Sequence, residues 1–83
     1  MAQVQIEYCV ECLYLARALE TAQALLESYA DQLSSLELLP GSRGVFTVTL
    51  DDRVLYRMKE GEWRLPSPEL LKRQVGEALS SVV

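Results

Sequence analysis

A cysteine pair at the junction of an alternating segment and a helical one places the strongest constraint on how this chain folds. Residues 4–8 alternate apolar and polar side chains, which is the pattern of a strand with one apolar face. From about Cys12 to about Ala30, apolar side chains recur every three or four positions without Gly or Pro, which predicts a helix. Cys9 and Cys12 therefore fall on the turn from a first strand into a first helix.

The rest of the chain predicts three more strands, at residues 33–39, 45–50 and 53–59, and a second helix that opens with Ser67 and Pro68. A strand–helix–strand connection gives parallel strands with a right-handed crossover, and the short Asp-Asp link makes the last two strands a hairpin. The order is thus β-α-β-β-β-α. We expect an α+β, thioredoxin-like, two-layer fold, with a four-stranded mixed sheet of order 2-1-3-4 and two helices on one face.

The first predicted helix carries a stripe of apolar side chains. Its opposite side is filled with Arg, Glu and Gln, so we expect the stripe to face the core. The stripe consists of Leu15, Leu19, Ala22, Leu26 and Tyr29, and Ala18 and Leu25 widen it.

Length and composition limit the class of protein. A chain of 83 residues makes one small domain, which we place at residues 1–83. The net charge of −4 disfavours nucleic acid and anionic membrane surfaces as partners. The chain lacks an apolar run of about 18 residues, and its first residues lack the basic and apolar stretches of a signal peptide. We therefore expect a cytoplasmic protein, in a compartment where thiols are kept reduced.

The spacing of the two cysteines suits thiol–disulfide exchange. A cysteine attacks as its thiolate, which the positive end of a helix stabilises. Two cysteines three positions apart can meet across one turn, so that one thiol attacks and the other resolves the mixed disulfide. Glu7 and Glu11 add negative charge nearby and should raise the thiol pKa somewhat, which predicts a mild reductant.

Zinc binding and core filling are the competing interpretations of the pair. The sequence has no histidine and no further cysteine, so a zinc site within one chain would lack two ligands. A dimer could share four cysteines, and the sequence leaves the oligomeric state open. Two buried cysteines could also be simple core filler, although filler has no reason to fall on the strand–helix turn.

Three stretches together resemble the selenoprotein W-related, or Rdx, family. Residues 6–12 read IEYCVEC, residues 40–46 read PGSRGVF, and residues 66–70 read PSPEL. The resemblance covers nearly the whole chain. It implies a thioredoxin-like fold and a thiol redox activity linked to glutathione. In many eukaryotic members a selenocysteine occupies the position that matches Cys12.

The predicted topology brings a second loop to the cysteines. The second strand ends, and the third begins, at the sheet edge that holds the pair, so residues 41–44 should pass close to it. Which cysteine attacks stays open, since greater exposure on the turn favours Cys9 and the resemblance favours Cys12. Arg43 is expected either to stabilise a thiolate and hold a carboxylate of glutathione, or to be a solvated loop residue. The residues expected to line the site are Tyr8, Val10, Glu11, Leu13, Tyr14, Ser42 and Arg43, with Leu13 and Tyr14 as an apolar rim for a substrate.

The function that these observations predict is thiol–disulfide exchange with protein thiols or glutathione, in cellular redox homeostasis. No bound cofactor is expected, and glutathione would act as a co-substrate. The alternative is a non-enzymatic module whose thiols report redox state to a protein partner. Trp63 is the single tryptophan, and it either contacts a partner or covers the core under a loop.

Overall fold

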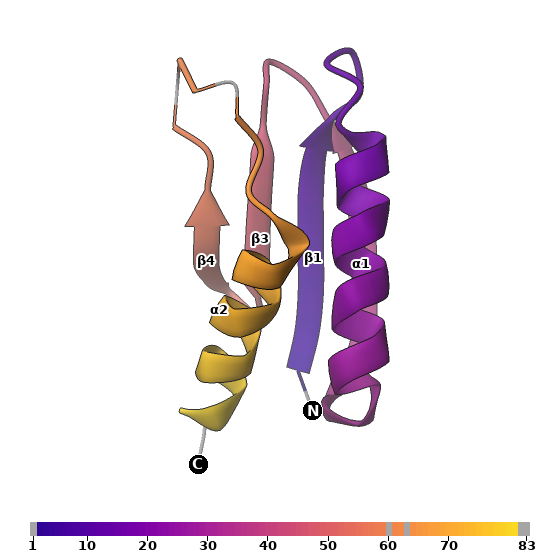
Figure 1. Cartoon of the computed structure of the whole chain (residues 1–83), viewed down its shortest axis with the longest axis vertical. Coiled ribbons are helices and arrows are strands. Elements are labelled where there is room, and N and C mark those ends of the chain that lie inside the picture. Colours follow the sequence, from indigo (N-terminus) through magenta and orange to yellow (C-terminus); the bar gives the residue numbers. More distant parts are fainter. Residues whose placement is uncertain (1, 60, 63, 82–83) are drawn as a thin grey trace.

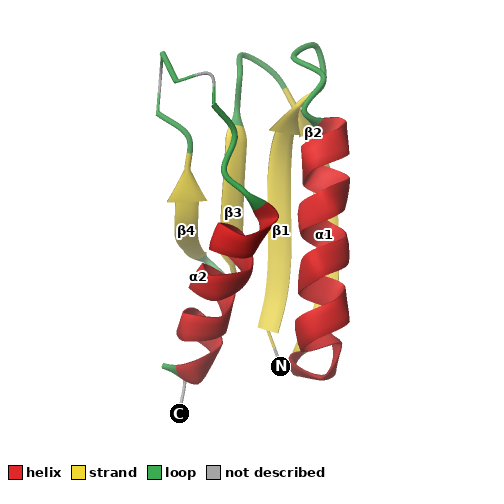
Figure 2. Cartoon of the chain, viewed as in Figure 1, coloured by secondary structure: helices red, strands yellow, loops and turns green. Residues whose placement is uncertain are grey.

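A computed structural model describes residues 2–59, 61–62 and 64–81, so that Trp63 lies outside the described residues. The four strands form one sheet in the order β2-β1-β3-β4 (Figures 1 and 2). β1 pairs in parallel with β2 and antiparallel with β3, and β3 pairs antiparallel with β4. This is the predicted sheet, and its strands are β1 (Ala2–Cys9), β2 (Leu33–Gly41), β3 (Phe46–Leu50) and β4 (Arg53–Arg57).

Two α-helices, α1 (Leu15–Tyr29) and α2 (Pro68–Ser80), cover one face of the sheet, as predicted (Figure 1). A short 3₁₀ turn, η1 (Ala30–Gln32), joins α1 to β2. Ser67 caps α2 because its Oγ accepts a hydrogen bond of 3.1 Å from the backbone N–H of Leu70. No helix in the described part of the chain is long and apolar enough to cross a membrane.

The core lies between the helices and the two central strands. Alternate residues of β1 and β3 point to the helices, as the period of two requires. These side chains are buried: Val4, Ile6, Phe46, Val48 and Leu50. On the other face, the amides of Gln3 and Gln5 both donate to Oε1 of Glu37, at 2.6 and 2.9 Å. That face is polar here, and no helix in the described part of the chain covers it (Figure 1).

The core-facing side of α1 differs from the predicted stripe. Leu15, Leu19 and Leu26 are 44%, 50% and 44% exposed, although Ala22 is buried and Tyr29 is half-buried. The helix is rotated so that smaller side chains face the sheet and α2, which allows a close approach of the two layers. The buried residues of α1 are Ala18, Thr21, Ala22 and Leu25.

The start of α1 also differs from the prediction. The helix begins at Leu15, with Tyr14 at the N-cap position, and not at Cys12. Residues 10–14 form a separate turn between β1 and the helix. Cys12 therefore lies two positions before the cap, and the unpaired N–H groups of the first helical turn belong to later residues.

Candidate redox site

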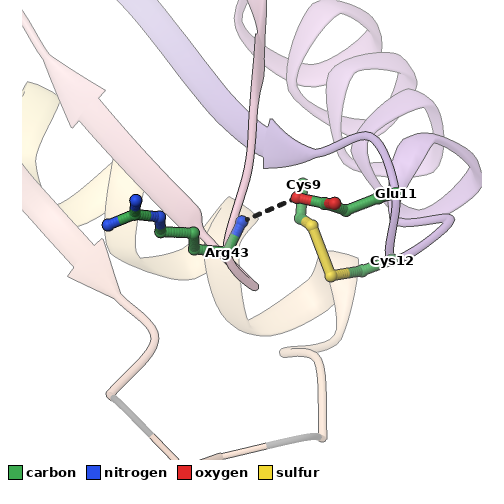
Figure 3. The surroundings of a disulfide bond; sticks show 4 residues. All are labelled: Cys9, Glu11, Cys12 and Arg43. Atoms are coloured by element: carbon green, nitrogen blue, oxygen red, sulfur yellow. Dashed lines mark hydrogen bonds between the residues drawn. A yellow bond between two sulfur atoms is a disulfide. The ribbon is translucent and has the colours of Figure 1, made fainter.

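The turn that carries the cysteines has a defined backbone geometry. The N–H of Leu13 donates to the carbonyl of Val10 at 3.1 Å, and the N–H of Tyr14 donates to the carbonyl of Cys9 at 3.2 Å. Leu13 has a φ of 62°. The second hydrogen bond encloses the first, and the left-handed residue, Leu13, directly precedes the last residue of the turn. This arrangement is a Schellman motif, which ends a single helical turn. The turn brings Cys9 and Cys12 to a Cα–Cα distance of 5.3 Å, and the two form a disulfide (Figure 3).

The two cysteines differ sharply in exposure. Cys9 is the last residue of β1 and is fully buried, at 0% exposure, whereas Cys12 is exposed. The backbone of Cys9 is held on one side by Gly41, its partner in β2, and on the other by a 2.8 Å hydrogen bond to the carbonyl of Val45. The expectation that Cys9 is the more exposed cysteine is therefore wrong, because neighbours on both sides enclose the end of a central strand.

The loop between β2 and β3 meets the cysteine turn through backbone groups. The N–H of Val10 donates to the carbonyl of Gly41 at 3.1 Å, and the N–H of Arg43 donates to Oε1 of Glu11 at 3.2 Å. The loop thus lies where the topology places it. In Figure 3 the guanidinium group of Arg43 points away from the disulfide, so it is the backbone of this residue that contacts the turn.

Gly41 was not among the predicted site residues, yet it sets how closely β2 approaches the site. A Cβ at this position would lie 2.7 Å from Cγ1 of Val45 and 2.9 Å from Oε2 of Glu7. Only glycine therefore allows the end of β2 to pack here without displacing a neighbour. The signal in the sequence is a glycine at a strand end, which often marks a close approach of another part of the chain.

The two tyrosines that were expected to line the site are partly buried and pack against the core. Tyr8 and Tyr14 are half-buried, and the ring of Tyr14 packs edge-on against Phe46 with a centroid separation of 6.4 Å. Tyr14 is therefore anchored to the core and contributes little to the predicted apolar rim. Leu13 and Val10 are the exposed apolar side chains of the turn, at 85% and 53% exposure.

Two of the polar residues predicted to line the site, Ser42 and Arg43, border a hollow on the face of the sheet opposite the helices, whereas Glu11 does not line it. Glu7, Thr47 and Arg57 lie side by side there, because they pair directly across β1, β3 and β4. Lys59 and Glu62 add a further cation and a further carboxylate to the lining of this hollow, whose volume is about 520 Å³. The lining of the hollow includes neither cysteine, and its two arginines offer a place for a carboxylate.

Metal binding finds no support in the side-chain arrangement. Among the residues that the structure describes, no group of three or more His, Cys, Asp or Glu side chains is placed to hold a metal ion.

Comparison with known proteins supports the fold and the family. The family model described as the Rdx family matches residues 3–77. Among solved structures, a protein from Bordetella parapertussis is 31% identical, with a TM-score of 0.82, and the match covers 93% of this chain and 96% of that chain. A selenoprotein W-related protein from Vibrio cholerae is 26% identical, with a TM-score of 0.84, and the match covers 94% and 96%. No match was found among curated proteins.

Proposed function

The chain belongs to the Rdx family, and from that membership together with the Cys9–Cys12 disulfide we propose that it is a thiol–disulfide redox protein of the cytoplasm. The observation that carries the proposal is the asymmetry of the pair. One sulfur belongs to an exposed residue and the other to a buried one, and the two are close enough to bond. An exposed thiol can attack a partner, and a buried neighbour can resolve the product without competing for it.

The reaction starts from the dithiol form. The thiolate of Cys12 attacks one sulfur of a partner disulfide; a mixed disulfide forms while the partner's S–S bond breaks, and the departing thiolate takes up a proton. The thiolate of Cys9 then attacks Sγ of Cys12, which closes the Cys9–Cys12 bond and releases the second partner thiolate to be protonated. Two electrons pass to the partner, and the two protons from the cysteines balance those on the partner thiols.

We propose glutathione as the co-substrate that restores the dithiol. Two glutathione thiols would be oxidised to glutathione disulfide as the Cys9–Cys12 bond is reduced. The hollow beside the redox turn supports this assignment, since Arg43 and Arg57 on its rim can pair with carboxylates and Glu7 with an ammonium group. Arg43→Ala should then slow reduction by glutathione more than reduction by the uncharged dithiol dithiothreitol.

Single-cysteine variants test the proposal. The reduced protein is mixed with glutathione disulfide, and the products are followed by mass spectrometry. The wild type should lose two hydrogens and keep no adduct. Cys9→Ser should accumulate a glutathione adduct on Cys12, whereas Cys12→Ser should react far more slowly. If both thiols of the wild type stay free under these conditions, the redox function is wrong.

Turnover distinguishes a catalyst from a sensor. Insulin and excess glutathione are supplied together, and reduction of insulin is followed over many equivalents of the protein. Continued reduction identifies an oxidoreductase. Reaction of one equivalent and no more identifies a module that records redox state by the same couple.

A further inference from the structure

Leu13 stands in a backbone position that its side chain does not favour. It is the left-handed residue of the Schellman motif, with a φ of 62°. Glycine usually occupies this place because a Cβ is crowded there, and a bulky apolar residue is unusual at positive φ. A leucine here strains the backbone of the folded chain.

Packing within the chain does not account for this leucine. Its side chain is 85% exposed, so it buries little apolar surface against the rest of the protein. Strained residues that persist without a packing reason cluster at functional sites. A role in contacts outside the chain would account for this leucine.

The place of Leu13 relative to the attacking sulfur indicates such a role. It directly follows Cys12, and Val10, two positions before Cys12, is 53% exposed. The hydrogen bond of 3.1 Å between the backbones of Leu13 and Val10 holds these two residues together at the surface of the turn. An exposed apolar pair therefore flanks the exposed cysteine.

Disulfide exchange brings the partner close to Val10 and Leu13. In the mixed disulfide the partner's sulfur is bonded to Sγ of Cys12, and residues next to the partner cysteine follow within about 3.8 Å of chain per residue. The side chains beside the partner's cysteine are then within reach of Val10 and Leu13, which are both exposed. Glutathione, by contrast, has no large apolar side chain to place there.

We propose that Leu13, with Val10, makes this protein selective for polypeptide disulfides whose cysteines are flanked by apolar side chains. This inference rests on the proposed redox function and names the substrate class for it. The covalent steps are those given above, with the polypeptide disulfide as the oxidant and Cys12 as the attacking group. Leu13 acts in specificity only and takes no part in proton or electron transfer.

The test compares three disulfide probes against the reduced protein. Two are symmetrical peptide disulfides, with Phe or with Ser on each side of the cysteine, and the third is glutathione disulfide. The wild type should react about tenfold faster with the Phe peptide than with the Ser peptide, a factor that partial burial of one leucine side chain supplies. Leu13→Gly should reduce the Phe-peptide rate to near that of the Ser peptide, and leave the other two rates within about twofold.

Matched variants separate selectivity from folding. Leu13→Gly removes a side chain at a position that suits glycine, so its thermal midpoint should not fall greatly, and Leu13→Asn serves as a second polar variant that tolerates positive φ. Leu26→Ala removes another exposed leucine, in the second half of α1, and should leave all three rates unchanged. Equal wild-type rates for the Phe and Ser peptides, or equal slowing of all three probes by Leu13→Gly, would overturn the inference. If none of the three disulfides oxidises the reduced wild type, the proposed redox function itself is wrong.

Discussion

Non-glycine residues at positive φ occur at both ends of the sheet, and their contacts differ. At the hairpin end, Asp51 has a φ of 54° in the β3–β4 turn. Its N–H donates to the carbonyl of Gln3 at 2.8 Å, and its Oδ1 accepts from the N–H of Gln3 at 3.1 Å. At the cysteine end, Arg43 has a φ of 60° and its N–H donates to Oε1 of Glu11 at 3.2 Å, whereas Leu13 has a φ of 62° and an apolar side chain that is 85% exposed.

This difference separates positions that close the fold from positions that serve a reaction. Asp tolerates the left-handed region and here ties the hairpin to β1, so the conformation of Asp51 contributes to stability. The backbone of Leu13 bonds within its own turn, to Val10, its side chain is 85% exposed, and its neighbour is the exposed Cys12. We infer that substitutions at the hairpin end change stability alone, whereas substitutions at the cysteine end change redox kinetics.

The largest effect is expected for Gly41→Ala, at the cysteine end. Its new methyl group would meet Val45 and Glu7 at less than 3.0 Å, so β2 or the loop must shift. Overpacking of this kind costs about 1–3 kcal/mol. The free energy of unfolding in urea should fall by that amount, and closure of the Cys9–Cys12 disulfide should slow.

Gly76→Ala is the matched control at the other end of the molecule. The added methyl would run into the Tyr29 hydroxyl, which now donates to the carbonyl of Lys72 at 3.0 Å. The phenol can move aside, and alanine favours the helix by about 1 kcal/mol, so the net change in stability should be smaller. Closure of the Cys9–Cys12 disulfide should be slowed in Gly41→Ala and unchanged in Gly76→Ala, which would support the difference between the two ends. Equal kinetics in both would contradict it.

An intermediate effect is expected for Asp51→Ala. This change removes the hydrogen bond to the backbone of Gln3 and places a residue that disfavours positive φ in the turn, at a cost of about 1–2 kcal/mol. Asp51→Gly loses the same hydrogen bond but suits the backbone, so its free energy of unfolding should lie between those of the wild type and Asp51→Ala. Urea unfolding measures the stability of both variants. A change in the rate of Cys9–Cys12 closure in either variant would contradict the inference that substitutions at the hairpin end change stability alone.

The smallest effect on stability is expected for Glu11→Gln. The amide oxygen can still accept from the N–H of Arg43, so the free energy of unfolding should change by less than about 0.5 kcal/mol. Loss of the negative charge should lower the pKa of the Cys12 thiol. Thiolate absorbance against pH measures this, with Glu27→Gln on α1 as the control. An unchanged thiol pKa would show that Glu11 has only a positioning role.

The fold follows from local patterns in the sequence, with two errors in α1, one in its core-facing side and one in its first residue. Alternation identified β1 and β3, and the crossover rule then determined the sheet order. The first error arose because leucine at positions 15, 19 and 26 outweighs alanine in hydrophobicity, whereas close packing against the sheet and α2 places the core at the side of the predicted stripe that holds Ala18, Ala22 and Leu25. The predicted start of α1 was wrong because the left-handed position of a Schellman motif is usually occupied by glycine, whereas here it is occupied by Leu13.

The composition of the site could be predicted more fully than its accessibility. The spacing identified the cysteine pair, and parallel pairing of β1 with β2 brought the loop around Arg43 beside it. The burial of Cys9 depends on contacts with Gly41 and Val45, which come from distant parts of the chain and leave no local pattern. The direction of the Arg43 side chain is likewise a result of tertiary structure.

Alkylation of the reduced protein tests the central claim most directly, namely that Cys12 attacks and Cys9 resolves. The dithiol is treated briefly with less than one equivalent of iodoacetamide, and the modified residue is identified by peptide mass spectrometry. Because Cys12 is exposed and Cys9 is 0% exposed, modification should fall on Cys12 by about tenfold or more. Equal modification of the two cysteines, or preferential modification of Cys9, would contradict the account.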